Sequence, residues 1–202
     1  MKIILIGAIG TIGSEVSKAL TARGHEVIGA SRSGNVSLDL ENSASIRGAF
    51  HQIREFDAVI CCAGNAVFKP LAELTEADFE LGLRSKLMGQ VSVARIAKDH
   101  LRSGGSITLT TGVLATQPMR GSASISMVNA ALEGFVRAAA LEMPPGTRIN
   151  AVSPPWVRET LTKLGMDPSI GLAAAEVAKA YVAAVERTYQ GAFLDPRHID
   201  PL

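Results

Sequence analysis

The first residues able to do chemistry lie near the start of the chain, where three glycines follow a short apolar run. Gly7, Gly10 and Gly13 come after KIILI, and a helical pattern follows them. Glycines let the backbone turn tightly and approach a pyrophosphate, and the next helix directs free N–H groups and a positive dipole end at that anion. This strand–turn–helix context predicts a dinucleotide-binding turn. The alternative is that the glycines serve packing alone.

The end of the second apolar run indicates which dinucleotide is bound. An acid at this point would hydrogen-bond the ribose 2′-hydroxyl of NAD and repel the 2′-phosphate of NADP. The chain has Ser31 and Arg32 here and no acid, and an arginine binds phosphate bidentately. NADP is therefore the predicted cofactor, and NAD is less favoured. The alternative for Arg32 is an ordinary solvent-exposed arginine.

Short apolar runs alternate with longer helical patterns along all 202 residues. The expected strands are 2–6, 26–30, 36–39, 58–62, 106–110, 148–152 and 192–194, and the expected helices are 14–23, 42–53, 76–101, 122–143 and 173–189. Such alternation means parallel strands with helices on both faces, and strands buried on both faces are nearly all apolar. We predict one Rossmann domain over residues 1–202, a doubly wound α/β sheet of about seven strands.

Composition excludes several classes of partner. The net charge is +1 and no basic stripe occurs, which argues against nucleic acid. The run before Gly7 is too short for a signal peptide core or a membrane span. Cys61 and Cys62 are adjacent in an apolar run, so we expect reduced, buried thiols in a cytoplasmic protein. The histidines form no cluster, and we expect no metal site.

Taken together, these motifs resemble the short-chain dehydrogenase/reductase superfamily along nearly the whole chain. The matching segments are GAIGTIG, the Asp39-Leu40 pair, CCAG at 61–64, ITLTTG at 107–112, NAALEGFVRAAALEM at 129–143, RINAVSPPWV at 148–157 and QGAFLD at 190–195. The two longest segments, when they occur together, are specific to this superfamily. The resemblance implies hydride transfer between a nicotinamide and a small carbonyl or alcohol, and a homodimer or homotetramer.

The resemblance also implies cofactor-binding roles by position. The phosphates and ribose would contact Gly7, Ile9, Gly10, Thr11 and Ile12. The adenine would lie between Asp39 and Leu40, and its ribose would lie along Ala63 and Gly64. The nicotinamide would be bordered by Pro154, Val157 and Thr160.

The catalytic positions of the family depart from its pattern in this chain. The family uses a tyrosine as proton donor, a lysine four residues later, a serine and an asparagine. Alignment on AALEGF places Ile125 at the tyrosine position and Asn129 at the lysine position. Gly112 falls at the serine position and Lys86 at the asparagine position. Isoleucine cannot exchange a proton, so another group must do so if the chain is an enzyme.

We predict that Lys86, with Thr111, replaces the missing pair, because a buried lysine loses proton affinity and becomes a weak acid near neutral pH. Asn129 can hydrogen-bond a ribose hydroxyl. Further hydroxyls are expected nearby from Thr110, Ser124 and Ser126. Two alternatives for Lys86 are extension into solvent and neutralisation of a cofactor phosphate.

The expected function is an NADP-dependent oxidoreductase with an atypical site. The alternative is a non-catalytic NADP(H)-binding sensor or regulatory protein, and a structural protein with an empty cofactor site is least favoured. Residues 158–171 form a short segment where the family usually covers its substrate. The expected pocket walls, for which core packing is the alternative, are Leu114, Met119, Trp156 and Leu161.

Overall fold

In the computed structural model, which describes residues 1–199, seven parallel strands form one sheet in the order β3-β2-β1-β4-β5-β6-β7. The strands are β1 Lys2–Ile6, β2 Glu26–Ser31, β3 Val36–Ser37, β4 Phe56–Cys61, β5 Leu101–Thr110, β6 Arg148–Val152 and β7 Phe193–Leu194. The predicted doubly wound sheet is confirmed. The last three residues of the expected 1–202 domain lie outside the described part.

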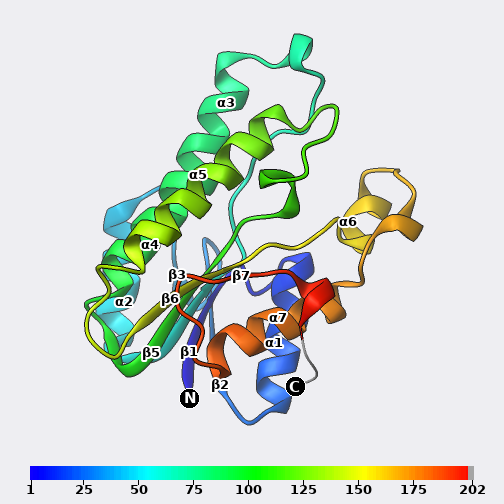
Figure 1. Cartoon of the computed structure of the whole chain (residues 1–202). Helices are drawn as coiled ribbons and strands as arrows, with labels where there is room; N and C mark the ends of the chain where they lie inside the picture. Colours follow the sequence, from blue (N-terminus) through cyan, green and yellow to red (C-terminus); the bar gives the residue numbers. More distant parts are fainter. Residues whose placement is uncertain (200–202) are drawn as a thin grey trace.

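Seven α-helices connect these strands within residues 1–199. They are α1 Thr11–Ala22, α2 Ser43–Ile53, α3 Glu76–Gly82, α4 Gly89–Ala97, α5 Ala123–Ala139, α6 Arg158–Lys163 and α7 Ala174–Glu186. Helices α1 and α7 cover one face of the sheet, and α2, α4 and α5 cover the other (Figure 1). None of the helices in the described residues is long and apolar enough to cross a membrane.

Alternation along β1 explains why the sheet has a core on each face. Ile4 and Ile6 pack with α2, α4 and α5, whereas Ile3 and Leu5 pack with α1 and α7. All four side chains are at most 2% exposed. Each such side chain contributes about 1.5–3 kcal/mol on burial, which favours a strand with no polar face. Strand β1 lies between β2 and β4, so the strand order reverses at its edge with β4.

The long helix expected over residues 76–101 is in fact three segments. Helix α3 ends at Gly82, a π-helical segment covers Leu83–Met88, and α4 ends at Ala97. The N-terminus of α3 is fixed by a capping box, in which Thr75 and Asp78 each bond the other's backbone N–H. A π-helical turn shifts the phase of the helix and is common at functional sites. The shift places Lys86 within the widened turn.

Strand β5 begins five residues earlier than the predicted 106–110 strand, because the Gly104-Gly105 pair lies inside the strand instead of ending a helix. Phe56 pairs with Leu101 and Ala58 with Ser106, so β5 bulges between these two pairs. Gly104 has φ +84°. A Cβ on Gly105 would lie 2.8 Å from the Arg102 carbonyl oxygen and 2.9 Å from that of Asp57. The bulge therefore requires this glycine pair.

Smaller differences from the expected boundaries occur at several ends. Helix α1 starts three residues earlier than expected, and β3 keeps only two of its four predicted residues. Helices α5 and α7 stop at Ala139 and Glu186, short of the expected 143 and 189, so Tyr189 lies beyond the last helix. Helix α6 was not predicted, because six residues are too few to show a helical period.

The C-terminal end of α7 is held by Arg148 of β6. Its Nη1 donates to the carbonyl oxygens of Ala184 and Tyr189 at 3.2 Å, and its Nη2 donates to that of Val185 at 3.0 Å. The last carbonyls of a helix lack partners within the helix, so a cation placed there satisfies them and suits the helix dipole. Burial lowers the pKa of Arg148 from its ordinary value.

We expect Arg148→Met to lower the free energy of unfolding by about 2–4 kcal/mol, since three charge-assisted hydrogen bonds are lost and half-buried carbonyls are left without donors. Urea denaturation of the two proteins measures the difference. Arg47→Met removes an exposed arginine from α2 and should change stability by no more than about 0.5 kcal/mol. Equal stability of all three proteins would contradict the role given to Arg148.

Candidate active site

The glycine turn after β1 is tightly folded and leads from the carboxyl end of the strand into α1. Gly7 has φ +84°, and its carbonyl accepts the Gly10 N–H at 3.0 Å. A Cβ on Gly13 would lie 2.1 Å from the Gly7 carbonyl oxygen, so only glycine fits there. The cap residue Gly10 offers no side-chain acceptor, and the first turn of α1 has no acid. The first N–H groups of α1 are therefore free to donate to an anion.

A cavity of about 360 Å³ lies beside this turn, beyond the carboxyl ends of β1, β2 and β4. It is lined by nine of the residues predicted to bind the cofactor: Gly7, Ile9, Gly10, Ser31, Arg32, Asp39, Leu40, Ala63 and Gly64. The structure thus brings together segments that are far apart in the sequence. Thr11 and Ile12 lie in the first turn of α1 and do not line it; the Thr11 hydroxyl instead accepts a hydrogen bond from Lys163 of α6 at 2.7 Å.

Charge in this cavity favours an anionic group near Arg32. Arg32 is exposed, and no acid within residues 1–199 forms an ion pair with it. Glu41 also lines the cavity, but Arg84 holds it in an ion pair with Nε 2.6 Å from the carboxylate. The guanidinium of Arg32 is therefore available to a ligand. Asp39 also lines the cavity, and its Oδ1 accepts the Glu41 backbone N–H at 3.0 Å.

A second cavity, of about 160 Å³, adjoins the first. It contains the three predicted catalytic residues, and its lining includes Lys86, Thr111, Gly112, Val113, Leu114, Ile125, Asn129, Pro154, Pro155, Trp156, Val157 and Thr160. Ser85 lines the larger cavity and Lys86 the smaller one. Gly64 has φ +127°, and a Cβ there would lie 2.9 Å from Lys86 Cα. The absence of a side chain at Gly64 lets the π-helical segment reach the edge of the sheet.

Lys86 extends into the smaller cavity. Its Nζ donates to the Thr111 carbonyl oxygen at 3.3 Å, and the side chain is half-buried. Desolvation lowers the pKa of Lys86 to about 8, and the nearby Cys61 thiol offsets this slightly. This placement contradicts the alternative in which Lys86 extends into solvent. At neutral pH most of the ammonium stays protonated, yet it releases a proton far more readily than an ordinary lysine.

The two adjacent threonines face opposite sides of the sheet. The Thr110 hydroxyl donates to the Cys61 carbonyl at 2.6 Å and lies 2.8 Å from the Tyr181 hydroxyl, away from the smaller cavity. Thr110 therefore supplies no hydroxyl there, contrary to expectation. Burial raises the pKa of Tyr181 well above its ordinary value, so this phenol is no substitute proton donor. Thr111 lines the cavity, but its hydroxyl donates to the Val152 carbonyl at 3.3 Å, and its own carbonyl contacts Lys86.

Asn129 and Gly112 fit each other. Asn129 is 1% exposed, and its Nδ2 donates to the Gly112 carbonyl at 3.5 Å. Its Oδ1 is buried and has no hydrogen-bond partner in the described residues. A Cβ on Gly112 would lie 2.9 Å from Asn129 Nδ2, so the carboxamide occupies the space of a side chain at 112. The orphaned oxygen is a ready acceptor for a ligand hydroxyl.

Ile125 lines the cavity as expected, but its serine neighbours do not. Ser124 is fully buried, and Ser126 lies 3.0 Å from the Ser122 hydroxyl. Of the expected pocket walls, Leu114 and Trp156 line the cavity. The Trp156 Nε1–H donates a hydrogen bond to Met119 Sδ, with 3.3 Å between nitrogen and sulfur. Leu161 is fully buried and lines no part of the cavity, so it packs the interior under α6.

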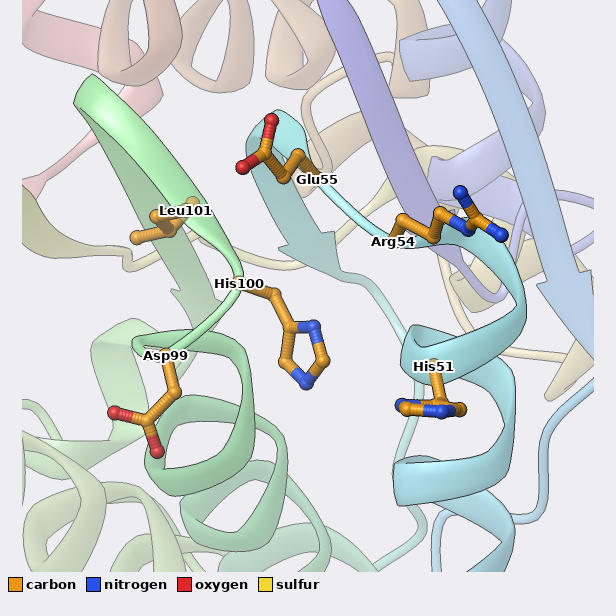
Figure 2. A pocket seen from close by; sticks show the side chains of 6 residues that line it. All are labelled: His51, Arg54, Glu55, Asp99, His100 and Leu101. Carbon is orange, nitrogen blue, oxygen red and sulfur yellow. The ribbon is translucent and has the colours of Figure 1, made fainter.

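A different hollow, of about 420 Å³, opens at the amino ends of β4 and β5 (Figure 2). It is lined by His51, Arg54, Glu55, Asp99, His100 and Leu101. Charges of both signs line it, and none of the predicted site residues does. No group of three potential metal ligands forms anywhere in residues 1–199. Ligands of open parallel sheets bind beyond the carboxyl ends of strands, which favours the two adjoining cavities over this one.

The chain is similar to known proteins over most of its length. The family model described as Enoyl-(Acyl carrier protein) reductase matches residues 8–185. Hydroxynaphthalene reductase arp2 of Aspergillus fumigatus is 29% identical over 185 residues, covering 86% of this chain and 66% of that protein. Hydroxynaphthalene reductase-like protein Arp2 of Metarhizium majus is 33% identical, covering 58% and 45%. The chain therefore spans less than two thirds of these relatives' length.

Two solved structures are similar over almost their whole length. The protein lin1944 from Listeria innocua superposes with a TM-score of 0.91 at 39% identity, covering 96% of this chain and 98% of that one. A small-chain dehydrogenase in complex with NADPH superposes with a TM-score of 0.85 at 26% identity, covering 96% and 95%.

We expect Gly112→Ala to lower the free energy of unfolding by about 1–3 kcal/mol, because the added Cβ meets the Asn129 carboxamide. Gly112 has φ 162°, which any residue adopts, so the steric contact is the sole obstacle. In the double variant Gly112→Ala, Asn129→Ala the cost of the alanine at 112 should fall by about 1 kcal/mol or more. Thermal and urea unfolding of the four proteins give the coupling. Additive effects would mean that the two residues do not share this space.

Proposed function

Since the chain belongs to the short-chain dehydrogenase/reductase superfamily, we propose that it is an NADP-dependent oxidoreductase that transfers hydride to or from a small carbonyl or alcohol. The observation on which the proposal rests is the pair of adjoining cavities. One presents a glycine turn and a free arginine, and the other presents a lysine of lowered pKa and an orphaned amide oxygen. Such convergence of polar groups in an apolar hollow is typical of an active site.

The larger cavity is suited to the adenosine half and the phosphates of NADP. The free N–H groups of α1 would hold the pyrophosphate, and Arg32 the 2′-phosphate. Asp39 and Leu40 would flank the adenine, and Ala63 and Gly64 its ribose. The NADPH complex of the small-chain dehydrogenase, at 26% identity, supports this choice of cofactor.

The smaller cavity is suited to the nicotinamide half and the substrate. The Asn129 Oδ1 would accept a hydrogen bond from a ribose hydroxyl, while Pro154, Val157 and Thr160 would border the ring. When bound, the cofactor supplies a hydride at its nicotinamide ring. Ile125, Leu114 and Trp156 would form an apolar wall beside the reacting atoms.

Lys86 supplies the proton in this proposal. During reduction, hydride adds to the carbonyl carbon, the π electrons move to oxygen, and that oxygen takes a proton from the Lys86 ammonium. The Thr111 carbonyl holds the ammonium in place. Lys86 then regains its proton from solvent. The role of Thr111 is thus to position the lysine through its backbone oxygen.

The second candidate is a non-catalytic NADP(H)-binding sensor or regulator. Ile125 favours it, because an isoleucine stands where a proton donor is expected, and Tyr181 is bonded to Thr110 elsewhere. A panel of aldehydes and ketones separates the candidates, since only the enzyme consumes NADPH with one of them.

We further propose that two copies associate through the faces of α4 and α5. A hollow of about 390 Å³ on this face is lined mainly by apolar side chains, among them Ala94, Phe135 and Met143.

Cys61 and Cys62 are free thiols, which supports a cytoplasmic location.

We expect Arg32→Met to raise the Kd for NADPH by about ten- to a hundredfold, because a charge-assisted contact with the 2′-phosphate is lost. The Kd for NADH should be unchanged, since NADH has no 2′-phosphate. Calorimetric titration measures both. Lys163→Met is the matched variant: Lys163 bonds Thr11 beside the pyrophosphate turn, so its loss should weaken NADPH and NADH by the same factor. An equal loss for both cofactors in Arg32→Met would contradict recognition of the 2′-phosphate.

We expect the rate of carbonyl reduction to be constant below about pH 8 and to fall above it, because the Lys86 ammonium must be protonated to act as the acid. Lys86→Met should lower kcat by about a hundredfold or more while still binding NADPH. Lys179→Met, on the exposed surface of α7, is the control and should leave kcat unchanged. Undiminished turnover of Lys86→Met would eliminate Lys86 as the acid.

A further inference from the structure

The positive charge of Lys86 has no negative partner among residues 1–199. No aspartate or glutamate lines the smaller cavity. The groups facing it are backbone or neutral: Thr111 and Gly112 after β5, Ile125 and Asn129 on α5, and the 154–157 segment after β6. From β4 the Cys61 thiol faces Lys86, and burial raises the pKa of Cys61 to about 12, so it is neutral.

An isolated charge in this place distinguishes the two redox states of a nicotinamide. The oxidised ring carries a positive charge and the reduced ring carries none, while the phosphates and adenosine are the same in both. In a partly buried site, with an effective dielectric constant of about 20, two like charges a few ångströms apart repel strongly enough to change a Kd at least about tenfold. Arg32 lines the other cavity and acts equally on both forms.

We propose that the Lys86 ammonium makes this site selective for the reduced cofactor, so that the protein binds NADPH more tightly than NADP⁺. The inference rests on the proposed function, because it requires the nicotinamide to enter the smaller cavity. It serves either candidate: a reductase is loaded with the form it consumes, and a sensor responds to the ratio of the two forms.

In the enzyme, proton transfer removes and restores the charge on Lys86 in each turnover, so the preference for the reduced cofactor is lost and regained. Lys86 is charged while NADPH is held, and it is neutral once its proton has passed to the substrate oxygen. The oxidised ring and the charged lysine thus coexist only after solvent has returned a proton to Nζ. That reprotonation then favours release of the oxidised cofactor.

The test is calorimetric titration of the full chain with NADPH and with NADP⁺ at about pH 7 and about pH 9, on either side of the Lys86 pKa. The wild type should bind NADPH at least about tenfold more tightly at the lower pH, and lose this preference at the higher one. In Lys86→Met the ratio should be close to one at both values. Lys86→Arg keeps its charge, and should keep the preference at both.

Two controls separate this effect from general damage. Lys179→Met should behave as the wild type, and 2′,5′-ADP, which lacks the nicotinamide, should bind all variants alike. A preference for NADPH that survives in Lys86→Met, or no preference in the wild type, would overturn the inference while leaving the cofactor site intact. Failure of the wild type to bind either dinucleotide would overturn the proposed function, and this inference with it.

Discussion

The contact between Gly64 and Lys86 is the constraint on which the site depends. A Cβ at Gly64 would lie 2.9 Å from Lys86 Cα, so the π-helical segment reaches the sheet only because residue 64 has no side chain. This approach joins the nucleotide cavity to the smaller one, and it brings Nζ to the Thr111 carbonyl. The lowered pKa of Lys86 follows from the same burial.

In the alignment predicted from the sequence, two residue types have exchanged positions in this site. That alignment gives Lys86 the position of the family's asparagine and Asn129 the position of its lysine. The structure shows one cation and one amide around the same hollow. Gly112 completes the arrangement, because its missing side chain leaves room for the Asn129 carboxamide. The replacements that the alignment predicts are therefore compatible with one another in the structure.

Much of this arrangement was predictable from the sequence, since strongly apolar runs and a glycine turn are local signals. The run IILI predicted a strand buried on both faces. Nine residues predicted to bind the cofactor line one cavity, and seven of them were predicted from family positions. The π-helical segment was not predictable, because a helical periodicity does not show an inserted residue. Thr110 was misplaced because residues adjacent in a strand point to opposite faces, and Leu161 because α6 was not foreseen. The fit of Asn129 to Gly112 depends on side-chain packing across elements.

The outermost strands of the sheet, β3 and β7, are each two residues long. Runs such as IILI and AVIC, which are apolar, uncharged and rich in β-branched residues, lie instead in β1 and β4 at the interior of the sheet. A strand of two residues offers a passing chain only a short backbone ladder of its own. The same parallel sheet that builds the site thus keeps its most apolar strands away from its borders.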